Sequence, residues 1–192
     1  MKNYEFEIAE QFALQTNQHI FLTGKAGTGK TTLLKHIAEK TTKNFVIVAP
    51  TGVAAINAGG VTIHSMFYLP LTLFVPTNDF VDRNVATNKR MLASHLRFNS
   101  DKRRVLLEME LLIIDEVSMV RCDILDAIDF VLQTVRRNNN PFGGVQVMLI
   151  GDMHQLPPVT RDNDWELLRK YYASPYFFDS LVYQNLDVVQ NI

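Results

Sequence analysis

The stretch Gly24–Thr31 reads GKAGTGKT, which matches the pattern G-x-x-x-x-G-K-[ST]. It follows a short apolar run typical of a strand and precedes a run with helical spacing, which is the context that the pattern requires. Its glycines let successive N–H groups face inward, and the N-terminus of the following helix adds the positive end of its dipole. The stretch therefore predicts a phosphate-binding loop, with a chance match to the pattern as the alternative.

The side chains at the end of this loop have their own roles in phosphate chemistry. Lys30 can reach the β- and γ-phosphates of a nucleotide, and the Thr31 hydroxyl can bind Mg²⁺. The residues predicted to contact the nucleotide are Gly24, Ala26, Gly27, Thr28, Gly29, Lys30, Thr31 and Thr32.

Four apolar runs around the loop read as buried strands. They are bulky or β-branched and nearly continuous, as expected for a parallel sheet covered on both faces. The four runs are His19–Thr23, Phe45–Val48, Leu111–Ile114 and Val145–Ile150. Helical spacing lies between them, over 31–40 and over 117–135, so the chain predicts an α/β sheet with right-handed crossovers.

The helix predicted over 117–135 has apolar residues at steps of three and four. These are Val117, Val120, Ile124, Ile128, Val131 and Val135, while Arg121, Asp123, Asp126 and Asp129 take other positions around the helix. Cys122 on this helix is expected to be a buried structural thiol.

Two carboxylates follow the strand Leu111–Ile114. Ligands of α/β sheets bind at the carboxyl ends of the strands, so Asp115 is positioned to hold Mg²⁺ and Glu116 to activate a water that attacks the γ-phosphate. An acid pair at this point favours a hydrolase over a small-molecule kinase. The alternative is a solvated acidic turn.

A third polar strand end is Gly151–Val159. Gly151 and the prolines Pro157 and Pro158 direct the chain out of the strand and stiffen its exit. Gln155 on this turn can contact the γ-phosphate or the attacking water, and Asp152 either anchors the turn or contacts the water shell of the metal. An ordinary surface loop is the alternative.

Length and composition set the broad class. The chain has 192 residues, a formal net charge of −1, 47% hydrophobic and 20% charged residues, and one cysteine. These values exclude a disordered or collagen-like chain and a disulfide-stapled secreted scaffold. Without a membrane-length apolar run or a signal-peptide core, we expect one soluble, cytoplasmic domain over 1–192, with a small insertion over about 68–104. At least part of the aromatic tail from Trp165 is expected to pack on the core, and a further strand to begin near Leu186.

The net charge hides an uneven distribution. Residues 83–104 contain seven Lys or Arg residues and one acid, a net charge of +6, so the rest of the chain carries −7. Such a segment attracts a phosphate backbone, and Arg103 and Arg104 are its candidate DNA contacts. A solvated surface is the alternative.

Taken together, these motifs resemble those of superfamily-one DNA helicases, most closely the petite-integration-frequency (Pif/RecD-like) family. Ala49–Asn57 resembles motif Ia, and Gly60–Phe67 resembles the family's threonine-histidine-serine motif. Leu112–Val120 resembles motif II and Gly143–Val159 motif III. The resemblance spans Gly24 to Val159 and continues more weakly to about Ser180.

The resemblance implies a RecA-like P-loop NTPase domain: a mostly parallel sheet with helices on both faces and an insertion between motifs Ia and II. It implies an ATP- and Mg²⁺-dependent motor that moves 5′ to 3′ on single-stranded DNA, with roles in repair, recombination and telomere maintenance. Lys30, Glu116 and Gln155 would be its catalytic residues, and Thr31 and Asp115 its metal ligands.

For DNA, the resemblance implies a track lined by Pro50, Thr51, Gly52, His64 and Ser65. The rings of His64 and Phe67 can stack on bases, which is tolerant of sequence because every base has a π-face. For each ring, burial in the core is the alternative.

Two departures from the family pattern matter. None of Gln11, Gln15 and Gln18 lies at the spacing of the family's adenine-reading glutamine, and the sequence stops before any motif of a second RecA-like domain. The expected partners are therefore single-stranded DNA and a second RecA-like domain of a parent chain, with no membrane. Another P-loop ATPase, of the loader or transport type, and a non-catalytic nucleotide- or DNA-binding module are the alternatives.

Overall fold

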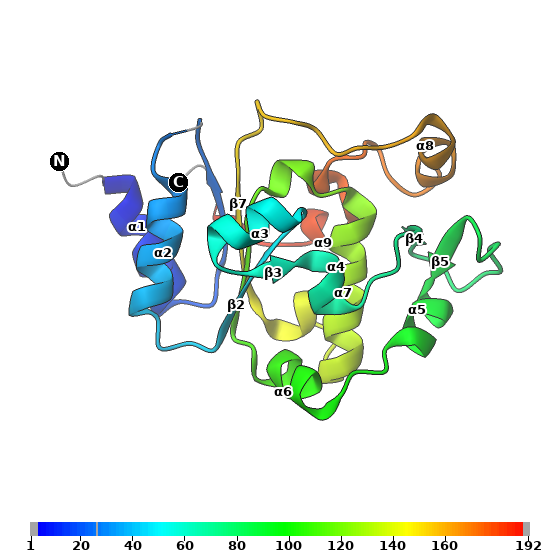
Figure 1. The fold of residues 1–192 in the computed structure, drawn as a ribbon, viewed down its shortest axis with the longest axis horizontal. Coiled ribbons are helices and arrows are strands. Elements are labelled where there is room, and N and C mark those ends of the chain that lie inside the picture. The colour runs from blue at the N-terminus through cyan, green and yellow to red at the C-terminus, as the bar shows by residue number, and fades with distance from the viewer. Residues whose placement is uncertain (1–3, 26, 190–192) are drawn as a thin grey trace.

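A six-stranded parallel sheet forms the centre of the computed structural model, which describes residues 4–25 and 27–189 (Figure 1). The strand order is β3-β2-β6-β7-β1-β8, and every neighbouring pair is parallel. The strands are β1 (His19–Thr23), β2 (Phe45–Ala49), β3 (Val61–Thr62), β6 (Leu111–Ile114), β7 (Gln146–Gly151) and β8 (Val188–Val189). The four strands predicted from the sequence are confirmed, and β8 begins two residues after the predicted position.

Side chains of the central strands alternate between two apolar cores, one on each face of the sheet. On β6, Leu111 and Ile113 face one core while Leu112 and Ile114 face the other. Helices α1 (Tyr4–Gln15) and α2 (Lys30–Lys40) cover the first face. The second face is covered by α4 (Ile63–Phe67), α6 (Ser100–Glu108) and α7 (Cys122–Arg136), and Figure 1 shows the sheet between α2 and α7. The predicted α/β class, with helices on both faces, is confirmed.

The predicted helix over 117–135 is wrong in its first turn. Val117–Met119 form a 3-10 turn, η1, and α7 begins only at Cys122. The chain cannot run straight through, because Glu116 has a positive φ of 53° and Arg121 is extended and bridges to Tyr176. The break separates the acidic end of β6 from the long helix.

The predicted insertion contains its own two-stranded parallel sheet, β4 (Leu73–Val75) and β5 (Ala86–Asn88), followed by α5 (Lys89–His95). Leu73, Val75 and Ala86 share a small apolar core with Cys122 and with Leu168 of α8 (Asp162–Leu168). Cys122 is fully buried there, as its predicted structural role requires.

The remaining elements connect or cover these layers. They are α3 (Gly52–Ala58), η2 (Pro141–Gly144), η3 (Phe177–Asp179) and α9 (Leu181–Gln184). Phe177 is fully buried and makes edge-to-face contacts with Phe21 and Tyr183, so the aromatic tail packs on the core as predicted. No helix in the described part of the chain is both long and apolar enough to cross a membrane.

Three aspartates spaced by three along α7 hold three other segments of the chain. Asp123 accepts the N–H of Phe74 in β4 at 3.0 Å, and Asp126 accepts those of Leu181 and Val182 in α9 at 3.1 and 2.9 Å. Asp129 accepts the N–H of Phe142 in η2 at 2.6 Å. Because residues at i and i+3 are neighbours on a helix, the three carboxylates form one stripe. The apolar periodicity gave no reason to expect these acids to be structural.

The burial of Asp129 leads to a test. Desolvation raises the pKa of its carboxyl from an ordinary 3.8 to about 6, although the Phe142 N–H and the Gln133 amide oppose the shift. A raised pKa in the folded state means that this carboxyl contributes stability below pH 4, and that the contribution is lost as pH rises toward 6.

We therefore expect the stability of Asp129→Asn, compared with that of the parent chain, to be highest at pH 7. The unfolding free energy of Asp129→Asn minus that of the parent should decrease by at most about 3 kcal/mol between pH 7 and pH 4. Urea titrations at several pH values measure this. Glu39→Gln, at an exposed acid on α2, is the control and should track the parent. A pH-independent difference for Asp129→Asn would contradict the assignment.

Candidate functional site

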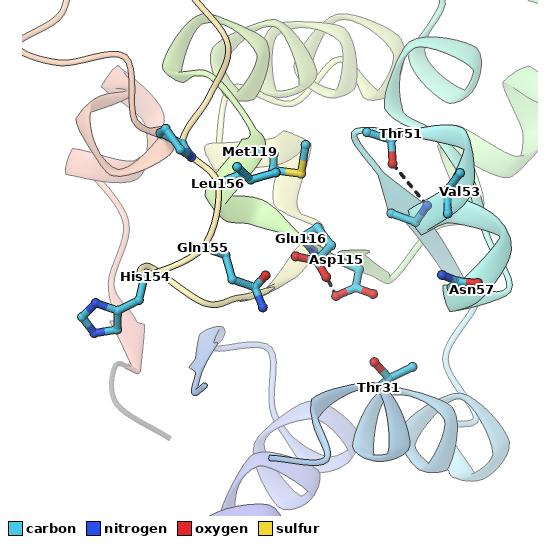
Figure 2. A pocket seen from close by; sticks show the side chains of 12 residues that line it. Thr31, Thr51, Val53, Asn57, Asp115, Glu116, Met119, His154, Gln155 and Leu156 are labelled. Carbon is cyan, nitrogen blue, oxygen red and sulfur yellow. Dashed lines mark hydrogen bonds between the residues drawn. The ribbon is translucent and has the colours of Figure 1, made fainter. Parts of the chain in front are cut away.

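A cavity of about 690 Å³ opens at the carboxyl edge of the sheet. Thr31 of α2, the acids after β6 and Gln155 after β7 all line it, together with residues of α3. Figure 2 shows Thr31 across the cavity from Asp115 and Glu116, with the Gln155 side chain reaching toward the acids. The three polar strand ends singled out in the sequence therefore meet in one place.

The phosphate loop connects β1 to α2, as predicted. Gly27 and Gly29 adopt φ values of 79° and 92°, a left-handed region that favours glycine. At Gly29 a side chain would also collide with the ring of Phe6, because an added Cβ would lie 3.0 Å from a ring carbon. The loop is thus built from residues that can take this path.

Lys30 points back over the loop. Its ammonium group donates to the carbonyl of Gly24 and, at 3.0 Å, to that of Lys25. Of the predicted nucleotide contacts, Thr31 lines the cavity, while Gly24, Gly27, Thr28, Gly29 and Lys30 form the loop beside it. Thr32 is exposed on α2 but is not on the cavity wall, and Ala26 lies outside the described residues.

The two acids are held by backbone geometry. The N–H of Asp115 donates to the Val48 carbonyl at 2.9 Å, and its Oδ1 accepts the N–H of Glu116 at 2.9 Å. Glu116 adopts a left-handed φ of 53°, which is strained for a residue with a Cβ and redirects its carboxylate relative to Asp115.

Burial raises the pKa of Asp115 and that of Glu116 above their ordinary values, and the charge of Lys30 opposes both shifts. The pKa of Glu116 is raised further by the charges of Asp115 and Asp152. Carboxylates that are desolvated and close to one another in a cavity favour the binding of a cation.

The turn that carries Gln155 is anchored by Asp152, the first of the two roles considered for this acid. Asp152 is buried; its Oδ1 accepts the N–H of His154 and its carbonyl accepts that of Gln155, both at 3.0 Å. Gly151 suits the strand end because an added Cβ would lie 2.9 Å from Cγ1 of Val117.

A second cavity, of about 220 Å³, lies beside the first on the same edge and shares Thr51 and Met119 with it. Pro50 and His64 also line it, and His64 is half-buried. Burial lowers the pKa of His64 and the charge of Arg121 lowers it further, which favours the neutral imidazole. Gly52 and Ser65 are exposed beside Thr51 and His64.

The hydroxyl groups of Thr51 and Thr62 shape this edge. Thr51 accepts the N–H of Ala54 at 3.2 Å at the start of α3, and Thr62 accepts that of Ser65 at 3.3 Å at the start of α4. These capping bonds fix the helix ends next to the cavity.

One expected DNA contact, Phe67, is wrong, and two other groups of candidate residues lie away from the cavities. Phe67 has no exposed surface, because its ring fills the core beneath α4, so it cannot stack on a base. Arg103 and Arg104 are exposed on α6, which leads into the amino end of β6, whereas Asp115 at the carboxyl end of β6 lines the first cavity. Figure 1 shows α6 at the bottom of the molecule, away from α3. Gln11, Gln15 and Gln18 are exposed and none of them lines the first cavity.

Sequence reasoning also missed site residues. Arg121 lines the second cavity, and its guanidinium donates to both oxygens of the fully buried Asp123 at 2.7 and 2.8 Å. In the sequence, Arg121 lies two residues before Asp123. The two residues form a bidentate pair because Arg121 is extended, directly before α7 begins.

Comparisons with known proteins agree with this geometry. A family model described as PIF1-like helicase matches residues 3–174. The chain is 35% identical over 153 residues to the ATP-dependent DNA helicase PIF1 of Saccharomyces cerevisiae (strain YJM789), and 38% identical over 152 residues to that of Homo sapiens. These alignments cover 77% and 78% of this chain, but only 16% and 21% of the two relatives.

Solved structures give the same result. The structure of Bacteroides Pif1 bound to ssDNA matches with a TM-score of 0.84 and 43% identity, covering 98% of this chain and 41% of that one. The structure of Bacteroides sp Pif1 in complex with ADP-AlF4 matches with the same values. The RecA-like fold predicted from the sequence is thereby confirmed.

The position of Phe67 generates a prediction. Phe67→Ala should lower the unfolding free energy by about 3–5 kcal/mol, since it removes a fully buried aromatic ring. Chemical denaturation measures this, and the milder Phe67→Leu keeps the chain folded for oligonucleotide titration. A Phe67→Leu variant with parental stability but weakened oligonucleotide binding would contradict the core assignment.

Proposed function

Because the chain belongs to the PIF1-like helicase family, we propose that it is the ATP-binding motor domain of a DNA helicase. Such a helicase couples ATP hydrolysis to 5′-to-3′ movement on single-stranded DNA and to unwinding of the duplex. The observation that carries the proposal is the cavity where Thr31, the Asp115–Glu116 pair and Gln155 meet from three separate segments of the chain.

In this proposal the phosphate loop binds the triphosphate through its N–H groups, and Lys30 exchanges its contacts with the loop carbonyls for the β- and γ-phosphates. Thr31 and Asp115 would hold Mg²⁺, which would neutralise phosphate charge. A hydroxyl and a desolvated carboxylate that face each other across the cavity fit this ion. Glu116 orients and deprotonates the attacking water. Gln155, on its anchored turn, contacts that water or the γ-phosphate.

The second cavity is the proposed contact with single-stranded DNA. Pro50, Thr51 and Gly52 present backbone and small side chains suited to phosphate, and a half-buried neutral His64 can stack on a base. Both cavities share Thr51 and Met119, so nucleotide and DNA would contact adjoining surfaces. A loader- or transport-type ATPase has no need for the second of these surfaces.

The chain spans about a fifth of the length of the curated relatives reported above, so helicase activity is proposed for a larger motor of which this domain is one part. Among the described residues that line the first cavity there is no arginine. In related phosphate-loop enzymes, an arginine supplied from outside the loop domain is worth about 10³–10⁵ in rate. We therefore propose that a second RecA-like domain completes the site.

Two variants separate nucleotide binding from hydrolysis. Lys30→Ala should abolish binding of a fluorescent ATP analogue, because the loop loses the ammonium group proposed to bind the β- and γ-phosphates. Glu116→Gln should retain binding and lose the remaining hydrolysis, measured as phosphate release. Equal hydrolysis by Glu116→Gln and the parent would contradict the role of Glu116, and would favour a non-catalytic module.

The isolated 192-residue chain should hydrolyse ATP slowly, and single-stranded DNA should stimulate it little. Phosphate release with and without oligothymidylate, on this chain and on a chain extended past Ile192, measures the difference. Brisk DNA-stimulated hydrolysis by the 192-residue chain alone would contradict the need for an external arginine.

His64→Ala should weaken binding of oligothymidylate and leave binding of the ATP analogue unchanged. Loss of one base–aromatic stack should cost about 1–3 kcal/mol of binding free energy. Fluorescence anisotropy measures this change. Loss of nucleotide binding in this variant would instead assign His64 a structural role.

A further inference from the structure

The second cavity does not end at His64. A third cavity, of about 360 Å³, adjoins it, and the two share Leu71, Arg121 and Val159. The third cavity lies between the insertion and the segment that follows β7: Asn84 and Val85 line one side, and Arg161 lines the other. In Figure 1 this segment runs from the sheet toward α8, on the same side of the molecule as β4 and β5.

Three exposed aliphatic side chains form an apolar rim on this continuous groove, although polar atoms make up most of the lining of the third cavity. Leu71, Val159 and Val85 are 91%, 80% and 53% exposed. All three line the third cavity, and the first two line both cavities. Such side chains suit the faces of unstacked bases.

Guanidinium groups occur along the same groove. Arg121 is held in place by the two hydrogen bonds from its Nε and Nη2 to Asp123, and its Nη1 donates no hydrogen bond within the described residues. Arg161 is exposed and forms no ion pair in the described part of the chain. On the insertion side, the exposed Arg83 directly precedes Asn84.

We propose that this third cavity is a phosphate-binding subsite for single-stranded DNA, in which Arg161 is the principal ligand and Arg121 a fixed second donor. This inference rests on the proposed function and extends the strand's path from His64 across Arg121 to the insertion. A polyanion with planar bases fits the combination of guanidinium groups and apolar rim.

Two carboxylates offset the guanidinium charges of this groove: Asp123, which pairs with Arg121, and Asp164. Asp164 lines the third cavity and lies close enough to raise the pKa of Arg121. It therefore reduces the positive potential that a phosphate would meet. Removing its charge should strengthen DNA binding, which gives the proposal a variant that acts in the opposite direction to the loss of Arg161.

The test is binding of fluorescein-labelled oligothymidylate to the 192-residue chain across a salt series. Arg161→Ala should reduce the slope of log K against log salt by about 0.7, the value for one phosphate contact on a single strand, and so weaken binding on the order of eightfold at 50 mM salt. Asp164→Asn should tighten binding by about two- to threefold. Arg169→Ala, at an exposed arginine that directly follows α8 and lies outside the cavity, is the matched control and should behave like the parent.

Thermal melts and binding of the ATP analogue should be unchanged in all three variants. If His64→Ala weakens DNA binding while Arg161→Ala and Arg169→Ala both match the parent, the third-cavity subsite is overturned and the proposed function stands. If the parent chain binds no oligothymidylate at all, this inference and the proposed DNA contact fail together, while the nucleotide site is judged by Lys30→Ala.

Discussion

The parallel register of four neighbouring strands is the constraint on which the site depends. Ile114 at the end of β6 pairs with Val48 of β2 and with Leu149 of β7, and Thr23 of β1 pairs with Gly151. These strands therefore end at the same edge of the sheet, and the loops that leave them bring the phosphate loop, Thr51, the acid pair and Gln155 together. A slip of one residue in a strand would exchange its two faces, so the two apolar cores fix the register and thereby the site.

Helix α7 connects this edge to the rest of the molecule. Three of its aspartates, two of them buried, hold β4, α9 and η2 through backbone N–H groups, and Asp123 also fixes Arg121 in the groove. A buried carboxylate is costly unless it is hydrogen-bonded, so each of these contacts specifies one arrangement of a peripheral segment. The Asp123 side chain thus accepts hydrogen bonds both from Phe74 of the insertion and from Arg121 of the proposed DNA groove.

The sequence was sufficient for the elements that depend on strong local patterns. Continuous apolar runs identified β1, β2, β6 and β7, and the glycine spacing identified the phosphate loop. It was insufficient where tertiary contacts decide. The extended Arg121 interrupts the apolar period that begins at Val117. The burial of Phe67 depends on which face α4 turns to the sheet, and the position of α6 places Arg103 and Arg104 toward the amino end of β6.

The central claim is that nucleotide binds at the carboxyl edge, between the phosphate loop and the acid pair. The most direct measurement is a crystal structure of the chain with Mg²⁺ and a non-hydrolysable ATP analogue. The account predicts phosphate oxygens within hydrogen-bond distance of the N–H groups of 27–31 and of the Lys30 ammonium group, and a metal ion beside Thr31 and Asp115. Nucleotide bound elsewhere, or with its phosphates turned away from Lys30, would contradict the account.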